Sequence, residues 1–229
     1  MTTLAALASI PSRSHLLPQT LASLRPQVDT LCVYLNGYEA APSCVLELAD
    51  HHVLDPVNSG AERKLHWADK HDGLYLSCDD DLLYPRDYAR RMGEAVSDWG
   101  GTAICTAHGR EYEGSPRDVH DVVPGSVGTY AMTVAHGRLI NHGGTGVMAW
   151  DAGKVHVPTE WGQRNIADMQ VALWAQQAGV PMYLVPHSGT WIGSLAMNDP
   201  RGLWRKSVKE GHARRNGLLR TRQWYRWTE

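Results

Sequence analysis

Three consecutive aspartates, Asp79, Asp80 and Asp81, are the residues of this sequence best suited to chemistry. They follow a short apolar run, residues 74–78, and precede a second apolar pair and a proline. Adjacent carboxylates repel one another, so a fold that holds them on one strand end must supply a counter-charge. Mg²⁺ and Mn²⁺ favour oxygen ligands and usually share them with substrate phosphates. The triplet therefore predicts a divalent metal site.

The alternative for any one of these aspartates is an ordinary loop role. Aspartate is common in turns because its side chain bonds nearby backbone amides. A single aspartate after a strand would fit that role, whereas three in a row behind a strand of buried type favour the metal.

The segments around the triplet alternate between strand-like and helix-like patterns. Strands are expected at 4–10, 30–35, 52–54, 74–78, 102–107, 147–150 and 182–185. Helical spacing or composition is found at 16–28, 42–49, 61–70, 85–99 and 165–178, the last with Asn165 as its expected N-cap. This alternation predicts a doubly wound, mostly parallel α/β sheet. Residues 108–142 break the pattern and are expected to form functional loops.

Polar side chains follow the ends of the expected strands, where open α/β sheets bind their ligands. They are Ser9, Pro11 and Arg13, then Asn36, Asp55, the triplet and finally His187. Together they predict one continuous edge that holds an extended anionic ligand. Lys64 follows Gly60 by one helical turn and can meet a phosphate there, although a single lysine is more often a solvated surface residue.

The composition is that of one soluble α/β domain, or a domain with a small appendage. The chain has 229 residues, of which 43% are hydrophobic and 20% charged. It contains no apolar stretch of the roughly 18 residues that a membrane-spanning helix needs. Its apolar start lacks a basic region and a cleavage site, so a cytoplasmic protein is expected.

Positive charge is concentrated at the C-terminus. Residues 203–229 carry eight Lys or Arg against two Glu, whereas the remainder carries 14 basic and 22 acidic residues. Such a tail is expected to meet an anion, and Arg205 and Lys206 are candidates for a diphosphate. Interleaved tryptophans also suit a membrane surface, an anionic acceptor or nucleic acid. The alternative is an amphipathic helix packed on its own domain.

The run from Gly60 to Lys70, followed by Gly73 to Pro85 with the triplet, resembles the nucleotide-sugar half of GT-A fold glycosyltransferases, particularly family 2-like bacterial enzymes. Segments 8–13, 33–36, 165–168 and 178–181 also fit the resemblance, which spans most of residues 4–192. It implies a GT-A, Rossmann-like sheet with a nucleotide-binding half at about 1–107 and an irregular acceptor half at about 108–192. Residues 193–229 then form a separate basic, aromatic tail.

The resemblance also implies roles for individual residues. The triplet corresponds to the family's DxD motif, in which Asp79 lies by ribose or metal, Asp80 lies on the nucleotide side and Asp81 ligates Mn²⁺ or Mg²⁺. His187 matches a further metal ligand, or is a plain loop residue. The nucleotide is then contacted by Ser9, Pro11, Arg13, Asn36, Asp55 and Lys64.

Asp168 matches the general base of inverting members of that family. An acidic residue in the first turn is also good helix-start chemistry, and this second interpretation stays open. Gly143 and Gly144 would let the backbone approach the donor sugar or acceptor, and Trp161 would offer a face to a sugar ring. These three residues have ordinary interpretations as turn glycines and a core tryptophan.

The resemblance implies a metal-dependent glycosyltransferase that moves a sugar from a nucleoside diphosphate, expected to be UDP, to a hydroxyl acceptor with inversion. The first alternative is a sugar nucleotidyltransferase, which would normally show a glycine-rich basic loop after the first strand. Residues 8–13 contain no glycine. The second alternative is a non-catalytic module that binds carbohydrate or nucleic acid. The intact triplet argues against this alternative.

Overall fold

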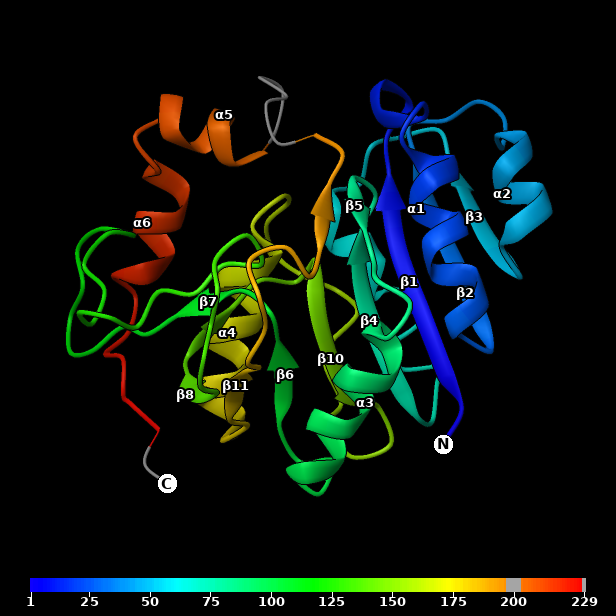
Figure 1. Ribbon diagram of the computed structural model, residues 1–229. Helices are drawn as coiled ribbons and strands as arrows, with labels where there is room; N and C mark the ends of the chain where they lie inside the picture. Colours follow the sequence, from blue (N-terminus) through cyan, green and yellow to red (C-terminus); the bar gives the residue numbers. More distant parts are fainter. Residues whose placement is uncertain (197–202, 228–229) are drawn as a thin grey trace.

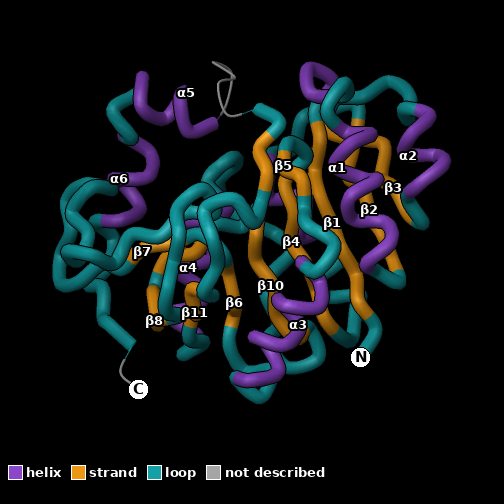
Figure 2. Tube along the Cα trace, in the orientation of Figure 1, coloured by secondary structure: helices purple, strands orange, loops and turns teal. Residues whose placement is uncertain are grey.

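The protein, seen in a computed structural model that describes residues 1–196 and 203–227, is built on one eight-stranded sheet (Figures 1 and 2). The strand order is β3-β2-β1-β4-β10-β6-β11-β8. The strands are β1 (Thr3–Ser9), β2 (Thr30–Asn36), β3 (His51–Asp55), β4 (Leu74–Asp79), β6 (Ile104–Thr106), β8 (Arg138–Ile140), β10 (Val147–Asp151) and β11 (Met182–Leu184). All run in one direction except β10 and β8, which are antiparallel to their neighbours. The expected mostly parallel α/β sheet is confirmed.

Helices cover both faces of this sheet because alternate residues of its buried strands point to opposite sides. On one face, alternate strand residues pack against α1 (Leu17–Leu24), α2 (Ser43–Leu48) and α3 (Tyr88–Asp98). On the other face they pack against α4 (Ala167–Ala178) and the 3₁₀ turn η3 (Ala61–Leu65). Leu7 and Leu76 are fully buried on the first face, and Tyr75 and Trp150 on the second.

The opposite direction of β10 is the feature that completes the site. Val147, at the start of β10, pairs with Cys78, near the end of β4. Because an antiparallel strand begins where its neighbour ends, residues 142–146 lie beside the aspartates that follow β4. Two small ribbons frame the same edge, namely β7 (Gly109–Arg110) with β9 (His142–Gly143), and β5 (Leu82–Leu83) with β12 (Gly193–Ser194).

The basic C-terminal segment packs on the domain, and within it α5 (Leu203–Lys209) and α6 (Ala213–Leu219) are helical. Leu219 is fully buried and Trp224 is 1% exposed, with its ring 5.1 Å from that of Tyr112. The backbones of Trp224 and Gly114 exchange two hydrogen bonds. The described part of the segment is therefore a structural part of the fold, as the amphipathic-helix alternative expected.

Two sequence-based expectations of local structure are wrong. Residues 61–70 form only the short turn η3 rather than a helix, because Glu62 and Lys64 are drawn into buried contacts with distant residues. Asn165 does not cap α4. It has a positive φ of 62°, and its Oδ1 accepts a hydrogen bond from the N–H of Ala61 at 3.0 Å.

No helix of the described residues is long and apolar enough to cross a membrane.

Candidate functional site

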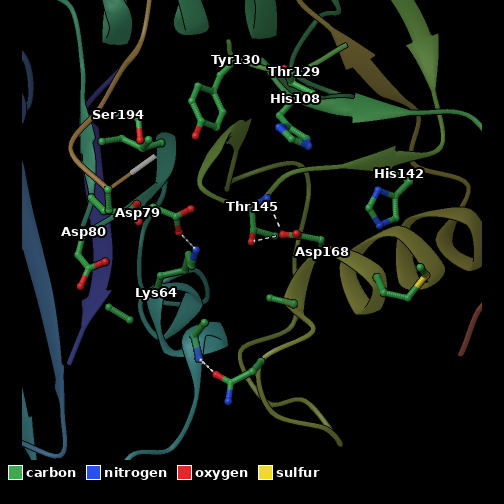
Figure 3. Close-up of a pocket in the computed structure, with 18 of the residues that line it drawn as sticks. Lys64, Asp79, Asp80, His108, Thr129, Tyr130, His142, Thr145, Asp168 and Ser194 are labelled. Carbon is green, nitrogen blue, oxygen red and sulfur yellow. Dashed lines mark hydrogen bonds and ion pairs between the residues drawn. The ribbon is translucent and has the colours of Figure 1, made fainter. Parts of the chain in front are cut away.

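A cavity of about 560 Å³ opens at the carboxyl ends of the parallel strands. Asp79, Asp80 and Lys64 lie on one side of it in Figure 3, His142 lies on the other, and Asp168 lies between them. Asp81 lines the same cavity. Thr145, Tyr130 and Ser194 also line it, and the C-terminal segment adds Arg205 and Arg215.

The counter-charge that the triplet requires comes first from the protein itself. Arg13 Nη1 lies 2.9 Å from Asp80 Oδ1 and 3.0 Å from Asp81 Oδ2. Lys64 pairs with Asp79, and its side chain is only 5% exposed. Burial, the largest single influence, would lower the pKa of Lys64, but the ion pair and hydrogen bond with Asp79, together with the charges of Asp168 and Asp80, raise it. Two cations thus hold three carboxylates in place.

That compensation is incomplete at Asp81. Burial, followed by repulsion from Asp79, raises the pKa of Asp81 from 3.8 to about 6, against the opposing effect of Arg13. Burial likewise raises the pKa of Asp80, which is only 3% exposed. The side chains of Asp79 and Asp81 are 41% and 18% exposed, so these two carboxylates are the accessible ones. The triplet retains an excess of negative charge that a bound cation would compensate.

Asp168 stands in the first turn of α4, as the sequence predicted. Its Oδ1 accepts hydrogen bonds from both the backbone N–H of Thr145, at 2.9 Å, and the Thr145 hydroxyl, at 2.6 Å (Figure 3). Burial alone would raise the pKa of Asp168, but His142, the Thr145 bonds and the charge of Lys64 hold it at about 2. Asp168 is therefore an ionised carboxylate with Oδ1 fixed by Thr145.

Tyr84 and Gly146 fix the position of Asp79. The Tyr84 hydroxyl accepts the Asp79 N–H at 2.7 Å and donates to the carbonyl of Gly146 at 2.7 Å. A Cβ atom at position 146 would come within 1.9 Å of Asp79 Oδ2. Glycine is therefore required at 146 for Asp79 to lie across the start of β10.

The far side of the cavity is basic. Arg110 and His142 are register partners in the β7–β9 ribbon, and Arg215 joins them from α6. Burial lowers the pKa of His142 to about 3 and that of His108 to about 4, so both imidazoles are neutral at pH 7. The sequence indicated functional loops at 108–142 but did not single out these residues, because no motif marks them.

Several residues expected to bind the nucleotide lie outside the cavity lining. Asn36 is 1% exposed and braces a turn, donating to the carbonyl of Gly60 and accepting from the N–H of Ser59. Asp55 accepts hydrogen bonds from Ser59, Val57 and Tyr34, and the Ser59 bond is the largest influence that lowers its pKa. These two side chains position the turn that leads to Lys64.

Ser9 and Pro11 also lie outside the lining. The hydroxyl of Ser9 is buried 3.1 Å from that of Tyr38, and Pro11 is an exposed residue at the start of a 3₁₀ turn. Of residues 10–14, which follow β1, only Arg13 lines the cavity. Its guanidinium group is paired there with the triplet.

His187 does not join the triplet. Its Nδ1 lies 2.8 Å from the carbonyl oxygen of Val185 and its Nε2 lies 3.1 Å from that of Thr129. It is 4% exposed and does not line the cavity. In this structure main-chain carbonyl oxygens lie within hydrogen-bond distance of both ring nitrogens of His187, and the residue stands apart from the triplet.

Gly143, Gly144 and Trp161 are likewise not in the lining. A Cβ at Gly144 would meet the His108 side chain at 3.0 Å, so this glycine permits close packing. Trp161 is partly buried against the core that contains α4. In the C-terminal segment Arg205 lines the cavity, whereas Lys206 is exposed and outside the lining.

Asp79 and Asp81 are the residues of this site whose chemistry would suit a divalent cation. Among residues 1–196 and 203–227, no group of three His, Cys, Asp or Glu side chains is arranged to hold a metal. Mg²⁺ is commonly bound by only one or two carboxylates together with substrate phosphates and water. Asp79 and Asp81, the more exposed members of the triplet, would suit that mode, while Asp80 is buried against Arg13.

Comparison with known proteins supports the α/β fold but does not identify an activity. No protein-family model matches the chain, and no curated protein sequence matches it. Among solved structures, the crystal structure of 4-diphosphocytidyl-2C-methyl-D-erythritol synthase resembles it with a TM-score of 0.52 at 11% sequence identity. The match covers 90% of this chain and 97% of the other. The chain therefore shares the α/β architecture of that protein.

Proposed function

We propose that this protein is a metal-dependent glycosyltransferase that uses a nucleoside diphosphate sugar, with UDP as the expected nucleotide. The observation that supports the proposal is that Asp168 and the aspartate triplet, 87 to 89 positions apart in the chain, line the same cavity. Departure of the diphosphate from the donor and deprotonation of the acceptor hydroxyl need these two kinds of group on either side of the reacting sugar carbon.

At the donor end, Asp79 and Asp81 would hold Mn²⁺ or Mg²⁺ together with the donor diphosphate. When bound, the cation would act as a Lewis acid on the departing diphosphate. Lys64 and Arg13 keep the carboxylates in place, and Arg205 can add a charge-assisted hydrogen bond to the diphosphate.

At the acceptor end, Asp168 would accept the proton of the attacking hydroxyl. The backbone N–H and the hydroxyl of Thr145 both donate hydrogen bonds to Oδ1. Oδ2 is thus the oxygen suited to meet the hydroxyl. A base on the face opposite the leaving group favours inversion at the sugar carbon.

A sugar nucleotidyltransferase remains the second candidate, because the solved structure reported above is named as a synthase of a diphosphocytidyl compound. Such an enzyme would release pyrophosphate from a nucleoside triphosphate. In this chain the residues after β1 form a 3₁₀ turn, Pro11–Arg13, whose arginine is paired with Asp80 and Asp81. That arrangement speaks for the glycosyltransferase.

One experiment separates these functions and the non-catalytic alternative. The protein is incubated with Mn²⁺, a panel of nucleotide-sugars and a mixture of hydroxyl acceptors, and in parallel with nucleoside triphosphates and sugar 1-phosphates. Release of a nucleoside diphosphate, abolished by EDTA and by Asp81→Asn, is the expected result. Pyrophosphate release would establish the nucleotidyltransferase. No turnover, with nucleotide-sugar binding unchanged by EDTA, would refute the metal-dependent enzyme.

A further inference from the structure

The basic side of the cavity points to the chemical class of the acceptor. We propose that Arg110, His142 and Arg215 form a subsite for a phosphate or carboxylate group, so that the acceptor is an anionic hydroxy compound. His142 lies beyond Asp168 from Asp79 and Asp80 in Figure 3, and Arg110 and Arg215 line the same cavity. As an acceptor subsite it rests on the proposed function, whereas anion binding there does not.

The first argument is geometric. Arg110 and His142 face one another across the antiparallel β7–β9 ribbon, so their side chains leave the ribbon on the same face. Arg215 reaches the same cavity from α6. Two guanidinium groups and an imidazole N–H can converge on the oxygens of one compact anion, which is the arrangement that phosphate and carboxylate recognition uses.

The second argument is an unsatisfied polar atom. His142 is 8% exposed, and its Nδ1 is buried with no hydrogen-bond partner among the described residues. Leaving a buried polar group unsatisfied costs about 1–3 kcal/mol, so such a group calls for a ligand. A neutral imidazole with its proton on Nδ1 would donate that hydrogen bond to an anion oxygen.

The third argument is charge. Burial, and then repulsion from Arg110, lowers the pKa of Arg215 although Asp168 acts in the opposite direction. Asp168 itself is bonded to Thr145. An anion bound between Arg110 and Arg215 would reduce the repulsion between the two guanidinium groups. It would also place a neighbouring hydroxyl of the same molecule near Asp168.

Hydrogen bonds hold the helix α6, which carries Arg215, to the domain. The next residue, Asn216, accepts the N–H of Val119 at 3.0 Å and donates to Asp118 at 2.6 Å. Most of the other basic residues of the C-terminal segment are used to hold it to the domain. Arg214, Arg220, Arg222 and Arg226 donate to Arg164, Arg117, Gln177 and Glu111, respectively. These hydrogen bonds hold the segment to the domain, while the four arginine side chains stay exposed at the surface.

The test titrates the protein calorimetrically with glycerol 3-phosphate, with glycerate and with uncharged glycerol. Phosphate or carboxylate binding, without glycerol binding, is expected, and the stronger probe identifies the anion. Arg215→Gln should weaken it at least about tenfold, equivalent to ~1.4 kcal/mol, and Arg215→Lys less. Arg214→Gln is the matched control, because this adjacent arginine is exposed and contacts only a backbone carbonyl among the described residues. It should leave binding within about twofold.

Three outcomes would overturn the subsite, namely equal binding of glycerol, equal losses in Arg214→Gln and Arg215→Gln, or no anion binding by the wild type. Melting temperatures of all variants confirm that each is folded. Anion binding that depends on Arg215, in a protein that cleaves no nucleotide-sugar, would support the anion site and overturn its role as an acceptor subsite. The proposed function and the further inference thus fail in different measurements.

Discussion

Lys64 forms an ion pair with Asp79 inside the cavity. The lysine is nearly fully buried, whereas 41% of the aspartate side chain is exposed. An aspartate held on one side by a lysine and open on the other can present its carboxylate to a ligand without moving. Lys64 is therefore a positioning residue for the triplet.

Replacing Lys64 by methionine should destabilise the protein, because Asp79 would then face Asp80 and Asp81 without its counter-charge. A loss of about 1–3 kcal/mol is expected in urea unfolding, as for a buried polar partner left unsatisfied. Asp79→Asn in the same chain should recover much of this loss, since it removes the uncompensated charge. If the two losses simply add, the pair does not couple and the positioning role is wrong.

Asp168→Asn should leave the donor bound and abolish most of the transfer. Asparagine can still accept from Thr145 but cannot take a proton, and general-base catalysis typically contributes about 10²–10⁴-fold. The measurement is kcat beside the dissociation constant of the nucleotide-sugar. Unchanged turnover per folded molecule, with a lower melting temperature, would assign Asp168 to the helix start alone.

The raised pKa of Asp81 predicts how stability changes with pH. The folded protein holds this proton up to about pH 6, whereas the unfolded chain releases it near 3.8. The resulting stabilisation is complete below about pH 4 and is lost as the pH rises through about 6. Asp81→Asn should therefore melt a few degrees higher than the wild type at pH 8, with a smaller difference at pH 5. Equal differences at the two pH values would contradict the shift.

The same variant should lose Mn²⁺-dependent binding of the nucleotide-sugar, measured calorimetrically with and without EDTA. A substitution that stabilises the fold while it removes binding is the behaviour expected of a residue kept for function. Binding that does not change would remove Asp81 from the proposed metal site.

Trp224→Ala should destabilise the whole domain, because its indole is buried against Tyr112. A loss of about 3–5 kcal/mol is expected from the cavity it leaves. Tyr225→Ala is the matched control, since this neighbouring aromatic side chain is 65% exposed. Similar melting temperatures for the two variants would show that the C-terminal segment is not part of the cooperative fold.

Much of the sheet could be predicted from the sequence because its strands are short apolar runs with clear ends. The segment from Leu74 to Cys78 is an example, and its aspartates lie where the pattern placed them. The η3 turn could not be predicted. Its residues have helical composition, but burial of Lys64 and Glu62 by distant partners overrides that local preference.

The acids of the candidate site were predictable, and so were Arg13, Lys64 and Arg205, but the basic groups on its far side were not. Asp79, Asp81 and Asp168 carry a local signal, either adjacency or position at a helix start. Arg215 and His142 have no such signal, since what unites them is a cavity wall built from two separate elements. Asn36 and Asp55 show the converse, because a polar residue at a strand end can serve a turn rather than a ligand.

The antiparallel strand β10 has a consequence for the order in which the molecule folds. Contacts at the edge of the site join residues that are far apart in the chain. Arg13 bonds Asp80, 67 positions away, and Ala61 bonds Asn165, 104 positions away. Closing loops of such length is slow compared with forming helices and local turns. A refolding chain should therefore regain its helical signal well before its affinity for the proposed nucleotide-sugar. Until β10 is docked against β4, the aspartates lack the neighbouring turn, residues 144–146, that completes their surroundings.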